Sequence, residues 1–216
     1  MVSIDGSAAR CGSFVDSCSV RLSDVISRGY RLEAGVYDAT SISARNIIES
    51  CKYGYSTMLA KGGMIDSVFR GPRFKKCDVD GFGRDAVGFL GSAEMLDVRP
   101  VPVKFITNVQ AKDLNLFANR GDILISCSGT IGNIGFVSKT LSGFALSSHM
   151  IRLTCSSYGG YVYACLKHRL VRDQLQSLVY GAVIQEIDPA HFGSCRCSGC
   201  SGGAEEEDQP HGRGGV

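Results

Sequence analysis

One stretch of this chain, residues 121–154, constrains the fold more than any other. It reads GDILISCSGTIGNIGFVSKTLSGFALSSHMIRLT, a series of short apolar segments separated by Gly, Ser and Thr. Apolar runs of this length bounded by turn-forming residues are typical of strands in a compact sheet. We predict strands at residues 123–128, 133–139, 143–148 and 149–154, with a tight turn at Ser128-Gly129-Thr130. The run contains no general acid, nucleophile–base pair or metal-binding cluster.

Helical periodicity is found on both sides of this strand-rich centre. Between residues 41 and 60, apolar side chains recur at the spacing of one helix face, and a second such pattern covers residues 161–179. The second pattern indicates a helix broken near Arg169 and ended by Gly181. The chain is therefore predicted to be a mixed α+β protein, strand-rich, with flanking helices.

The remaining segments are predicted to be mostly extended. Strands are expected at residues 64–69, 74–79, 86–90 and 183–187, whereas residues 20–26 suit either a short strand or a helical turn. Residues 99–104 should be extended, because each proline disfavours helix in the residue before it. The first 19 residues are small and polar and are expected to be flexible.

Length and composition favour one soluble domain. The 216 residues include 44% apolar residues, enough for a hydrophobic core. No apolar run approaches the roughly 20 residues that cross a bilayer, and no signal-peptide pattern is present, so we expect a cytoplasmic protein without a membrane partner. Most of the ten cysteines are scattered, several of them in apolar runs, and are expected to be reduced and structural.

The charge distribution points weakly to nucleic acid. The net charge is +2, but residues 193–216 carry a net −2, which leaves +4 on residues 1–192. Four positive charges lie within seven residues, at Arg70, Arg73, Lys75 and Lys76. Such a cluster suits contacts to DNA phosphates and guanine edges, and the alternative is a solvated basic edge. Less clustered candidates for DNA contact are Lys104, Lys112, Arg120 and Lys139.

Two polar sites in the central run are further candidates. The loop at residues 128–133 offers Ser128, Thr130 and Asn133 between glycines, which allow a phosphate or base edge to approach the backbone closely. Turn chemistry in a hairpin explains the same residues equally simply, and the Gly-Lys-Ser/Thr of a P-loop is absent. His149, after Ser147 and Ser148 at a strand junction, is a candidate for DNA contact rather than for catalysis.

No cofactor, metal site or catalytic centre is expected. Cys195, Cys197 and Cys200 form a single C-x-C-x-x-C cluster near His191 and His211, but zinc sites usually have paired C-x-x-C spacing. The chain also lacks the Asn/Asp-Pro-Pro-Tyr/Phe tetrapeptide and the F-x-G-x-G signature of DNA methyltransferases. It is therefore predicted to be a non-enzyme.

An ordered series of landmarks resembles the target recognition domain of type I restriction–modification specificity (S) subunits. Residues 31–38 (RLEAGVYD) resemble the start of that domain, and residues 121–132 (GDILISCSGTIG) resemble its "GDILIS-SGTIG" signature. The other landmarks, in chain order, are residues 69–76, 88–92 with 99–100, 147–152, 161–166 and 180–184. The resemblance covers most of residues 20–192, and its specificity lies in the order and spacing of the pieces.

The resemblance implies a non-catalytic subunit that directs a partner methyltransferase and endonuclease to a DNA sequence. Expected partners are double-stranded DNA, the methyltransferase (M) subunit, the restriction (R) subunit through it, and a second copy of the chain. A flexible segment at residues 1–19, a recognition domain at 20–157 and the start of a helical spacer with a closing strand at 158–192 are expected. A complete S subunit has two recognition domains and two spacer helices, so this chain would be a truncated or half subunit.

The end of the chain departs from the family pattern. An apolar VPVP-type strand usually follows a position like 192–193, but this chain has Ser194-Cys195-Arg196-Cys197. A GC-rich Val-Pro-Val-Pro codon run translated one base out of phase gives Cys-Arg-Cys. We therefore hypothesise a frameshift near Gly193 and expect residues 193–216 to be a disordered tail. Two other functions stay open: a nucleotide- or phosphate-handling enzyme using the loop at 129–135, and a non-functional remnant.

Overall fold

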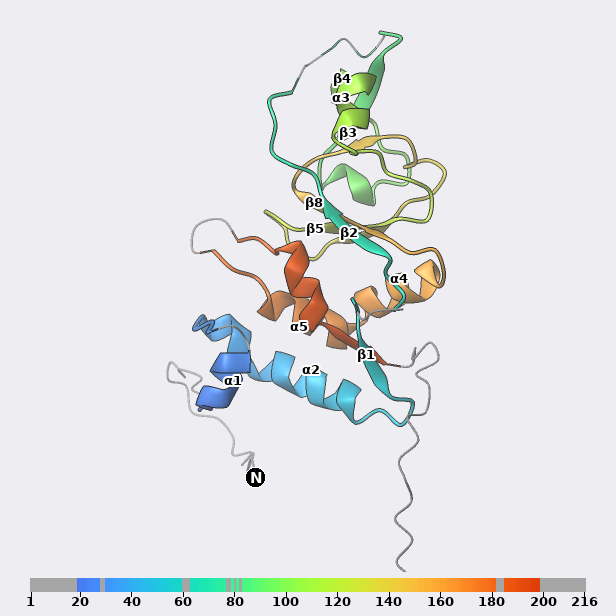
Figure 1. Ribbon diagram of the computed structural model, residues 1–216. Coiled ribbons are helices and arrows are strands. Elements are labelled where there is room, and N and C mark those ends of the chain that lie inside the picture. The colour runs from blue at the N-terminus through green and yellow to red at the C-terminus, as the bar shows by residue number, and fades with distance from the viewer. Residues whose placement is uncertain are drawn as a thin grey trace, which may run out of the picture. The chain divides into compact units, whose positions relative to one another are not determined.

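The computed structural model describes residues 19–27, 30–59, 63–76, 79, 81, 83–181 and 185–198. The chain divides into two units, residues 1–32 and 33–216. The first contains helix α1 (Leu22–Ser27), so residues 20–26 take the helical alternative. All other described elements belong to the second unit and form the mixed α+β fold that the sequence predicts (Figure 1). No helix in the described ranges is long and apolar enough to cross a membrane.

A four-stranded antiparallel sheet lies at the centre of the second unit. Its strand order is β2-β8-β5-β6, with bounds Ser67–Arg70, Met150–Thr154, Ile123–Ser126 and Ile134–Phe136. The strands predicted at 64–69, 123–128, 133–139 and 149–154 are confirmed, although β2 is shifted to end at Arg70 and β6 spans only three of the seven predicted residues. All four residues of β5 are buried, which explains why its sequence is a continuous apolar run rather than an alternating one.

A smaller sheet has the order β4-β3-β7, with bounds Lys104–Thr107, Ala86–Leu90 and Ala145–Leu146. These strands confirm the predictions at 86–90 and 143–148. Helix α3 (Asn108–Asp113) follows β4 and is capped by the Thr107 hydroxyl, and a 3₁₀ turn, η2 (Glu94–Leu96), follows β3. Residues 99–103 form no strand, and pairing begins at Lys104.

The strand predicted at residues 74–79 is wrong, because residues 71–76 and 79 belong to no strand. Pro72 has no backbone N–H to donate to a neighbouring strand. The apolar side chain of Phe74 packs edge-on against Phe89, with 6.0 Å between ring centroids. The Phe74–Phe89 ring contact, rather than a ladder of strand hydrogen bonds, therefore helps to hold this segment to the fold.

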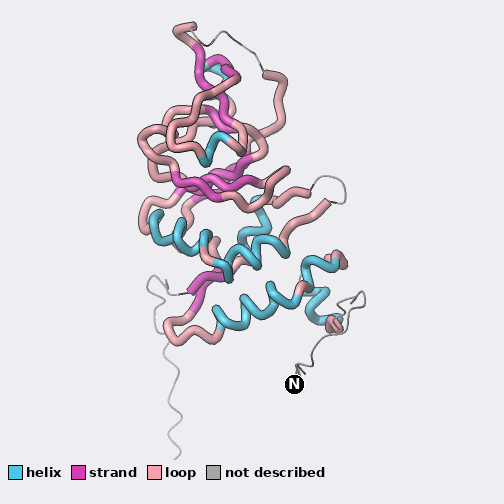
Figure 2. The backbone as a smooth tube through the Cα atoms, turned by 180° about the vertical axis from the view of Figure 1, so that it is seen from behind, coloured by secondary structure: helices cyan, strands magenta, loops and turns pink. Residues whose placement is uncertain are grey.

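Three helices cover one face of the central sheet region. They are α2 (Ala39–Glu49), α4 (Gly159–Lys167) and α5 (Arg169–Ser177), with a 3₁₀ turn η1 (Ala34–Tyr37) before α2. The predicted break near Arg169 is confirmed, because His168 ends α4 and caps α5 through its side chain. The two views place α5 between α2 and the strands of the central sheet (Figures 1 and 2).

The helix predicted at residues 41–60 is too long. It ends at Glu49, and Gly54 has φ +73°, a left-handed conformation that residues with a Cβ disfavour. The following residues form strand β1 (Tyr55–Thr57), which pairs antiparallel with β9 (Arg196–Ser198). The apolar residues of 55–59 repeat at helical spacing only by coincidence, since their partner strand lies 140 residues further along the chain.

The expectation of disorder from residue 193 is wrong for the described part of the tail, and residues 199–216 lie outside the described residues. Cys195 and Cys197 are buried in the main hydrophobic core, and the Met58 amide donates to the Cys195 carbonyl. The buried Gln174 amide hydrogen-bonds both the N–H and the C=O of Arg196, at 2.9 and 3.1 Å. Two small thiol side chains on one strand face are apolar enough to replace aliphatic residues.

The hydrophobic core has three parts. The largest joins α2, α4 and α5 to β5 and β8 and includes Ile48, Ile125, Leu166 and Phe192. A second surrounds Leu124 and Met150, and a third packs Phe89 and Ile106 of the small sheet. The apolar faces of α4 and α5 are thus buried within this chain.

Candidate DNA-binding face

A groove of about 370 Å³ opens between the segment that follows β2, Phe89 of β3, Ser128 after β5 and the loop that precedes β8. Nine residues line it: Pro72, Arg73, Phe74, Lys76, Phe89, Ser128, Ser147, Ser148 and His149. Four of the candidates from the sequence, Arg73, Lys76, Ser128 and His149, are therefore brought together from three separated stretches of chain. They meet because β2 and β5 both pair with β8, which places the ends of these strands side by side.

The groove combines an aromatic wall with cationic and hydroxyl groups. Phe74 and Phe89 form the edge-on pair described above, and the Lys76 ammonium lies 4.4 Å from the Phe89 ring centroid. Ser147 is buried, and its hydroxyl has no hydrogen-bond partner among the described residues. Aromatic faces, cations and hydroxyls are the groups that contact bases and phosphates in nucleic-acid complexes.

A second, shallower groove of about 250 Å³ shares Lys76 with the first. Its other lining residues are Val79, Val103, Lys104 and Phe105. Lys104, a loose candidate from the sequence, thus joins the same surface as the basic cluster. Together the two grooves place Arg73, Lys76 and Lys104 along one continuous face.

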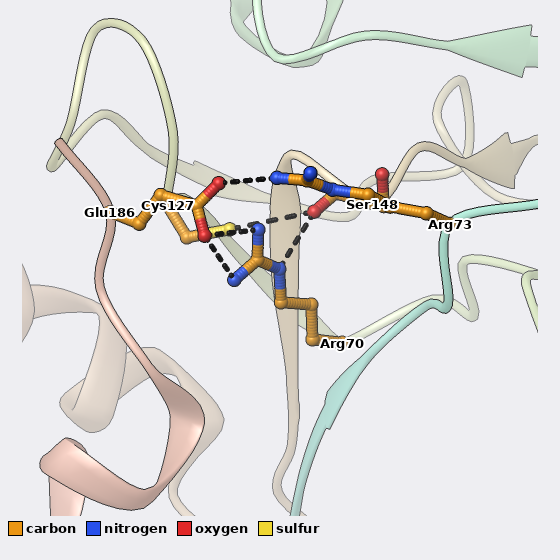
Figure 3. A network of polar contacts seen from close by, with 5 residues as sticks. All are labelled: Arg70, Arg73, Cys127, Ser148 and Glu186. Carbon is orange, nitrogen blue, oxygen red and sulfur yellow. Dashed lines mark hydrogen bonds and ion pairs between the residues drawn. The ribbon is translucent and has the colours of Figure 1, made fainter. Parts of the chain in front are cut away.

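Arg70 has a different role from the rest of the basic cluster. Its side chain is only 16% exposed, and both terminal nitrogens donate to Glu186 Oε2 at 3.1 Å (Figure 3). Its Nε donates to the Ser148 carbonyl at 2.8 Å. Arg73 donates to the other carboxylate oxygen, Oε1, at 2.7 Å, but its side chain is 72% exposed. Arg70 therefore fastens the segment around Glu186 to the sheet, whereas Arg73 stays accessible.

Cys127 lies at the back of this network. Its thiol is 3.8 Å from the Ser148 carbonyl, the group that also accepts from Arg70 (Figure 3). Burial raises the pKa of Cys127 to about 11, so the side chain is a neutral thiol at physiological pH. A protonated, buried thiol is a poor nucleophile, which assigns Cys127 a packing role.

The loop between β5 and β6 has the hydrogen bonds of a hairpin turn. The Ser126 hydroxyl donates to the Thr130 carbonyl and accepts from the Asn133 amide at 2.9 Å. Gly129 and Gly132 have φ of +78° and +82°, and a Cβ on Gly135 would lie 2.9 Å from the Met95 carbonyl. The backbone conformation or the close packing at each position therefore explains why it is a glycine. These contacts favour the turn interpretation over a phosphate cradle, and Thr130 and Asn133 do not line the groove.

The other basic candidates are exposed but line neither groove. Lys75, Lys112, Arg120 and Lys139 are all exposed. The Lys75 carbonyl accepts from the Gln110 side chain at 3.0 Å, which ties the basic segment to α3. These lysines and Arg120 stay candidates by charge alone.

The described residues contain no group of three or more His, Cys, Asp or Glu side chains placed to hold a metal ion. Cys200 and His211 of the tail cluster lie outside the described residues. Full burial raises the pKa of Cys195 to about 12, which opposes the thiolate form that zinc requires.

Three solved structures that this chain resembles come from type I restriction–modification systems. One, from a study of complex assembly and conformational transition in a type I system, matches 81% of this chain with a TM-score of 0.50 at 14% identity. The S subunit from M. genitalium and the HsdS subunit from Thermoanaerobacter tengcongensis match 60% and 80% of this chain, with TM-scores of 0.40 and 0.44, both at 14% identity. No family model and no curated protein matches.

The chain shares its fold with the solved chain of TM-score 0.50, which comes from a type I restriction–modification system. It spans between 30% and 45% of the length of these solved chains. At this level of identity the likeness concerns the fold, and the S-subunit function is a separate inference.

Sequence reasoning missed three parts of the candidate site. Glu186 lies between Gln185 and Ile187, and nothing in that stretch indicates that it accepts from two arginines more than 100 residues away. The sequence predicts a strand at Phe74, but this residue belongs to no strand and lines the groove. Ser126 organises the hairpin, but a serine inside a strand pattern gives no such signal.

Proposed function

We propose that this chain is a non-catalytic DNA-recognition domain of a type I specificity subunit. The observation that carries the proposal is the groove in which Arg73, Lys76, Ser128 and His149 converge beside an aromatic pair. The S-subunit fold supports it, because the groove belongs to a fold found in proteins of DNA restriction and modification. The domain would recognise one half-site of double-stranded DNA.

The division of labour follows from the chemistry of the side chains. Arg73, Lys75, Lys76 and Lys104 would neutralise phosphates, which fixes the position of the domain on the duplex but carries no sequence information. Ser128 and His149 would hydrogen-bond base edges in the major groove. Thr130 and Asn133 belong to the adjacent β5–β6 loop and would extend this surface, whereas Lys139 follows β6 at the opposite end of these strands and would be a further basic contact. Arg70 would act indirectly, by holding the segment of Glu186 in place.

We further propose that the chain works in a complex. Its M subunit would carry the methyltransferase chemistry, and the R subunit would join through M. The recognition domain would occupy residues 20–157 and the start of the spacer residues 158–192. The similar chain from a type I assembly supports such partners. Because α4 and α5 bury their apolar faces within this chain, contacts to M would use other surfaces of these helices.

The test is a salt-titrated fluorescence anisotropy assay on random-sequence duplex DNA, with and without co-expressed M subunit. Lys76→Gln and Lys104→Gln are each expected to weaken binding roughly threefold to tenfold and to lower the slope of log affinity against log salt by about one. Arg172→Gln removes the same charge from an exposed position on α5 that lines neither groove, and in the chain without M it should leave DNA binding unchanged.

The outcomes separate the alternatives. Enrichment of one short motif by the complex with M would support a working recognition domain. Binding that the lysine variants and Arg172→Gln weaken equally would mean that DNA contacts general positive charge, which would overturn the groove assignment. No saturable binding in either form would overturn the proposed function itself and favour a non-functional remnant.

A further inference from the structure

Glu186 is a carboxylate fixed beside a surface that is otherwise cationic. It lies after α5, and backbone hydrogen bonds hold it in place: its N–H and C=O pair with Tyr180 at 2.9 and 3.0 Å, and the next amide, of Ile187, donates to the Cys127 carbonyl at 3.0 Å. The Glu186 side chain is 14% exposed. Backbone pairing on both sides leaves the carboxylate little freedom to move.

The two oxygens of this carboxylate have different partners. Oε2 accepts from both terminal nitrogens of the half-buried Arg70, and Oε1 accepts from one nitrogen of the exposed Arg73 (Figure 3). An arginine has five N–H donors in a rigid fork. Arg73 can therefore keep its bond to Glu186 while other donors of the same guanidinium meet an anion at the groove.

A carboxylate on a DNA-binding face repels phosphates, so its negative charge alone would weaken DNA binding. The carboxylate would favour binding by fixing the orientation of the Arg73 side chain. A free arginine side chain samples many rotamers, and ordering it on binding opposes affinity. A carboxylate that holds Arg73 in the bound orientation removes part of that entropy loss before DNA arrives.

We propose that Glu186 is a positioning residue that holds Arg73 over the groove for a phosphate of bound DNA. This inference rests on the proposed DNA-binding function. It also makes DNA affinity depend on the docking of the segment after α5, since that segment supplies the carboxylate. Removing the negative charge at Glu186 is therefore expected to weaken DNA binding, whereas electrostatic repulsion alone would predict stronger binding.

The experiment is a double-mutant cycle in the full chain, measured by the same anisotropy assay. Glu186→Gln keeps one acceptor oxygen but replaces the other with an amide N–H₂, so it cannot accept from both arginines. We expect Glu186→Gln to weaken binding roughly threefold to tenfold when Arg73 is present, and to change it little or strengthen it in the Arg73→Gln background. Asp188→Asn is the matched control: it removes one negative charge two residues away and keeps its helix-capping oxygen. That control should leave binding unchanged or strengthen it slightly.

A second variant guards against misfolding of Glu186→Gln. Arg73→Lys keeps the charge at an exposed position but loses the fork that joins carboxylate and phosphate at once, so it should lose about as much affinity as Glu186→Gln. Stronger binding by Glu186→Gln, or an equal loss in both backgrounds, would overturn the positioning role. Absence of saturable binding by the wild-type chain and its M complex would instead overturn the proposed function.

Discussion

Two arginine–carboxylate networks lie on opposite faces of the same pair of strands. Arg152 of β8 pairs in register with Phe69, and Arg70 is the next residue along β2. Because successive side chains of a strand point to opposite faces, Arg152 and Arg70 serve different sides of the sheet. The Arg152 network is enclosed by the protein, whereas the Arg70 network, on the other face, reaches the groove.

Burial separates the two networks more than chemistry does. Arg152 and Asp122 have side chains 7% and 3% exposed, and the Arg152 guanidinium donates to the Asn115 and Phe117 carbonyls and lies 4.8 Å from the Phe69 ring centroid. Asp122 accepts from the Asn119 amide at 2.8 Å and the Thr154 hydroxyl at 3.1 Å. The Glu186 network instead shares its carboxylate with the exposed Arg73. An enclosed ion pair can only hold the fold, whereas a pair with one exposed member can also meet a ligand.

The largest expected effect on the free energy of unfolding comes from removing the arginine of the enclosed network. Arg152→Met should lower the free energy of unfolding by about 3–5 kcal/mol, because it leaves the Asp122 charge buried with no cationic partner. Urea denaturation followed by circular dichroism would measure it, since the chain has no tryptophan. The double variant Arg152→Met/Asp122→Asn should recover part of the loss. A loss below about 1 kcal/mol is typical of exposed pairs. It would mean that burial does not increase the contribution of the Arg152–Asp122 pair to the free energy of unfolding.

Arg70→Met should be less damaging. It removes the bonds to Ser148 and Glu186, for an expected loss of about 1.5–3 kcal/mol, the range for hydrogen bonds to charged groups. Glu186 keeps Arg73 as a partner, so no carboxylate is stranded. The same denaturation measurement applies, with Arg73→Met as the control that should cost little stability. If Arg70→Met proved as harmful as Arg152→Met, the distinction between open and enclosed networks would fail.

Alkaline pH should act on the groove-side network through Cys127. Its folded-state pKa is raised by burial from 9.0 to about 11, so the unfolded chain loses this proton first. The stabilising contribution of the neutral thiol is therefore complete below pH 9 and is lost as pH rises towards 11. Denaturation midpoints at pH 8, 9 and 10 should fall less steeply in Cys127→Ala than in the wild type. Parallel slopes would show that the thiol does not titrate differently in the folded state.

The smallest effect is expected for a fully surface pair. Arg169 and Asp173 are 3.5 Å apart at i,i+4 spacing on α5, with the arginine 83% exposed. Arg169→Gln should change the free energy of unfolding by no more than about 0.5 kcal/mol, because solvent screens such pairs. This variant sets the lower limit of the series. A loss comparable to that of Arg70→Met would show that exposure is a poor guide to these contributions.

The sequence was a good guide wherever a signal was local. The strands at 86–90, 123–126 and 150–154 follow from apolar runs bounded by turn residues. The loop around the turn predicted at Ser128-Gly129-Thr130 contains two glycines with positive φ, Gly129 and Gly132. The sequence misled where the deciding contact was distant. Tyr55 belongs to β1 only because β9 pairs with it, and Cys195 is ordered because it enters a core built mainly by α2, α4 and α5.

The candidate site shows the same limit. The basic cluster could be found from composition, but its members look alike in sequence. Tertiary structure made Arg70 a half-buried anchor and Arg73 an exposed contact. It also brought Glu186 into contact with both arginines and placed His149 in the groove with Arg73. Side-chain type and spacing determine local structure and available charge. Burial and the choice of partner decide what each charge does, because both depend on strand pairing between segments far apart in the chain.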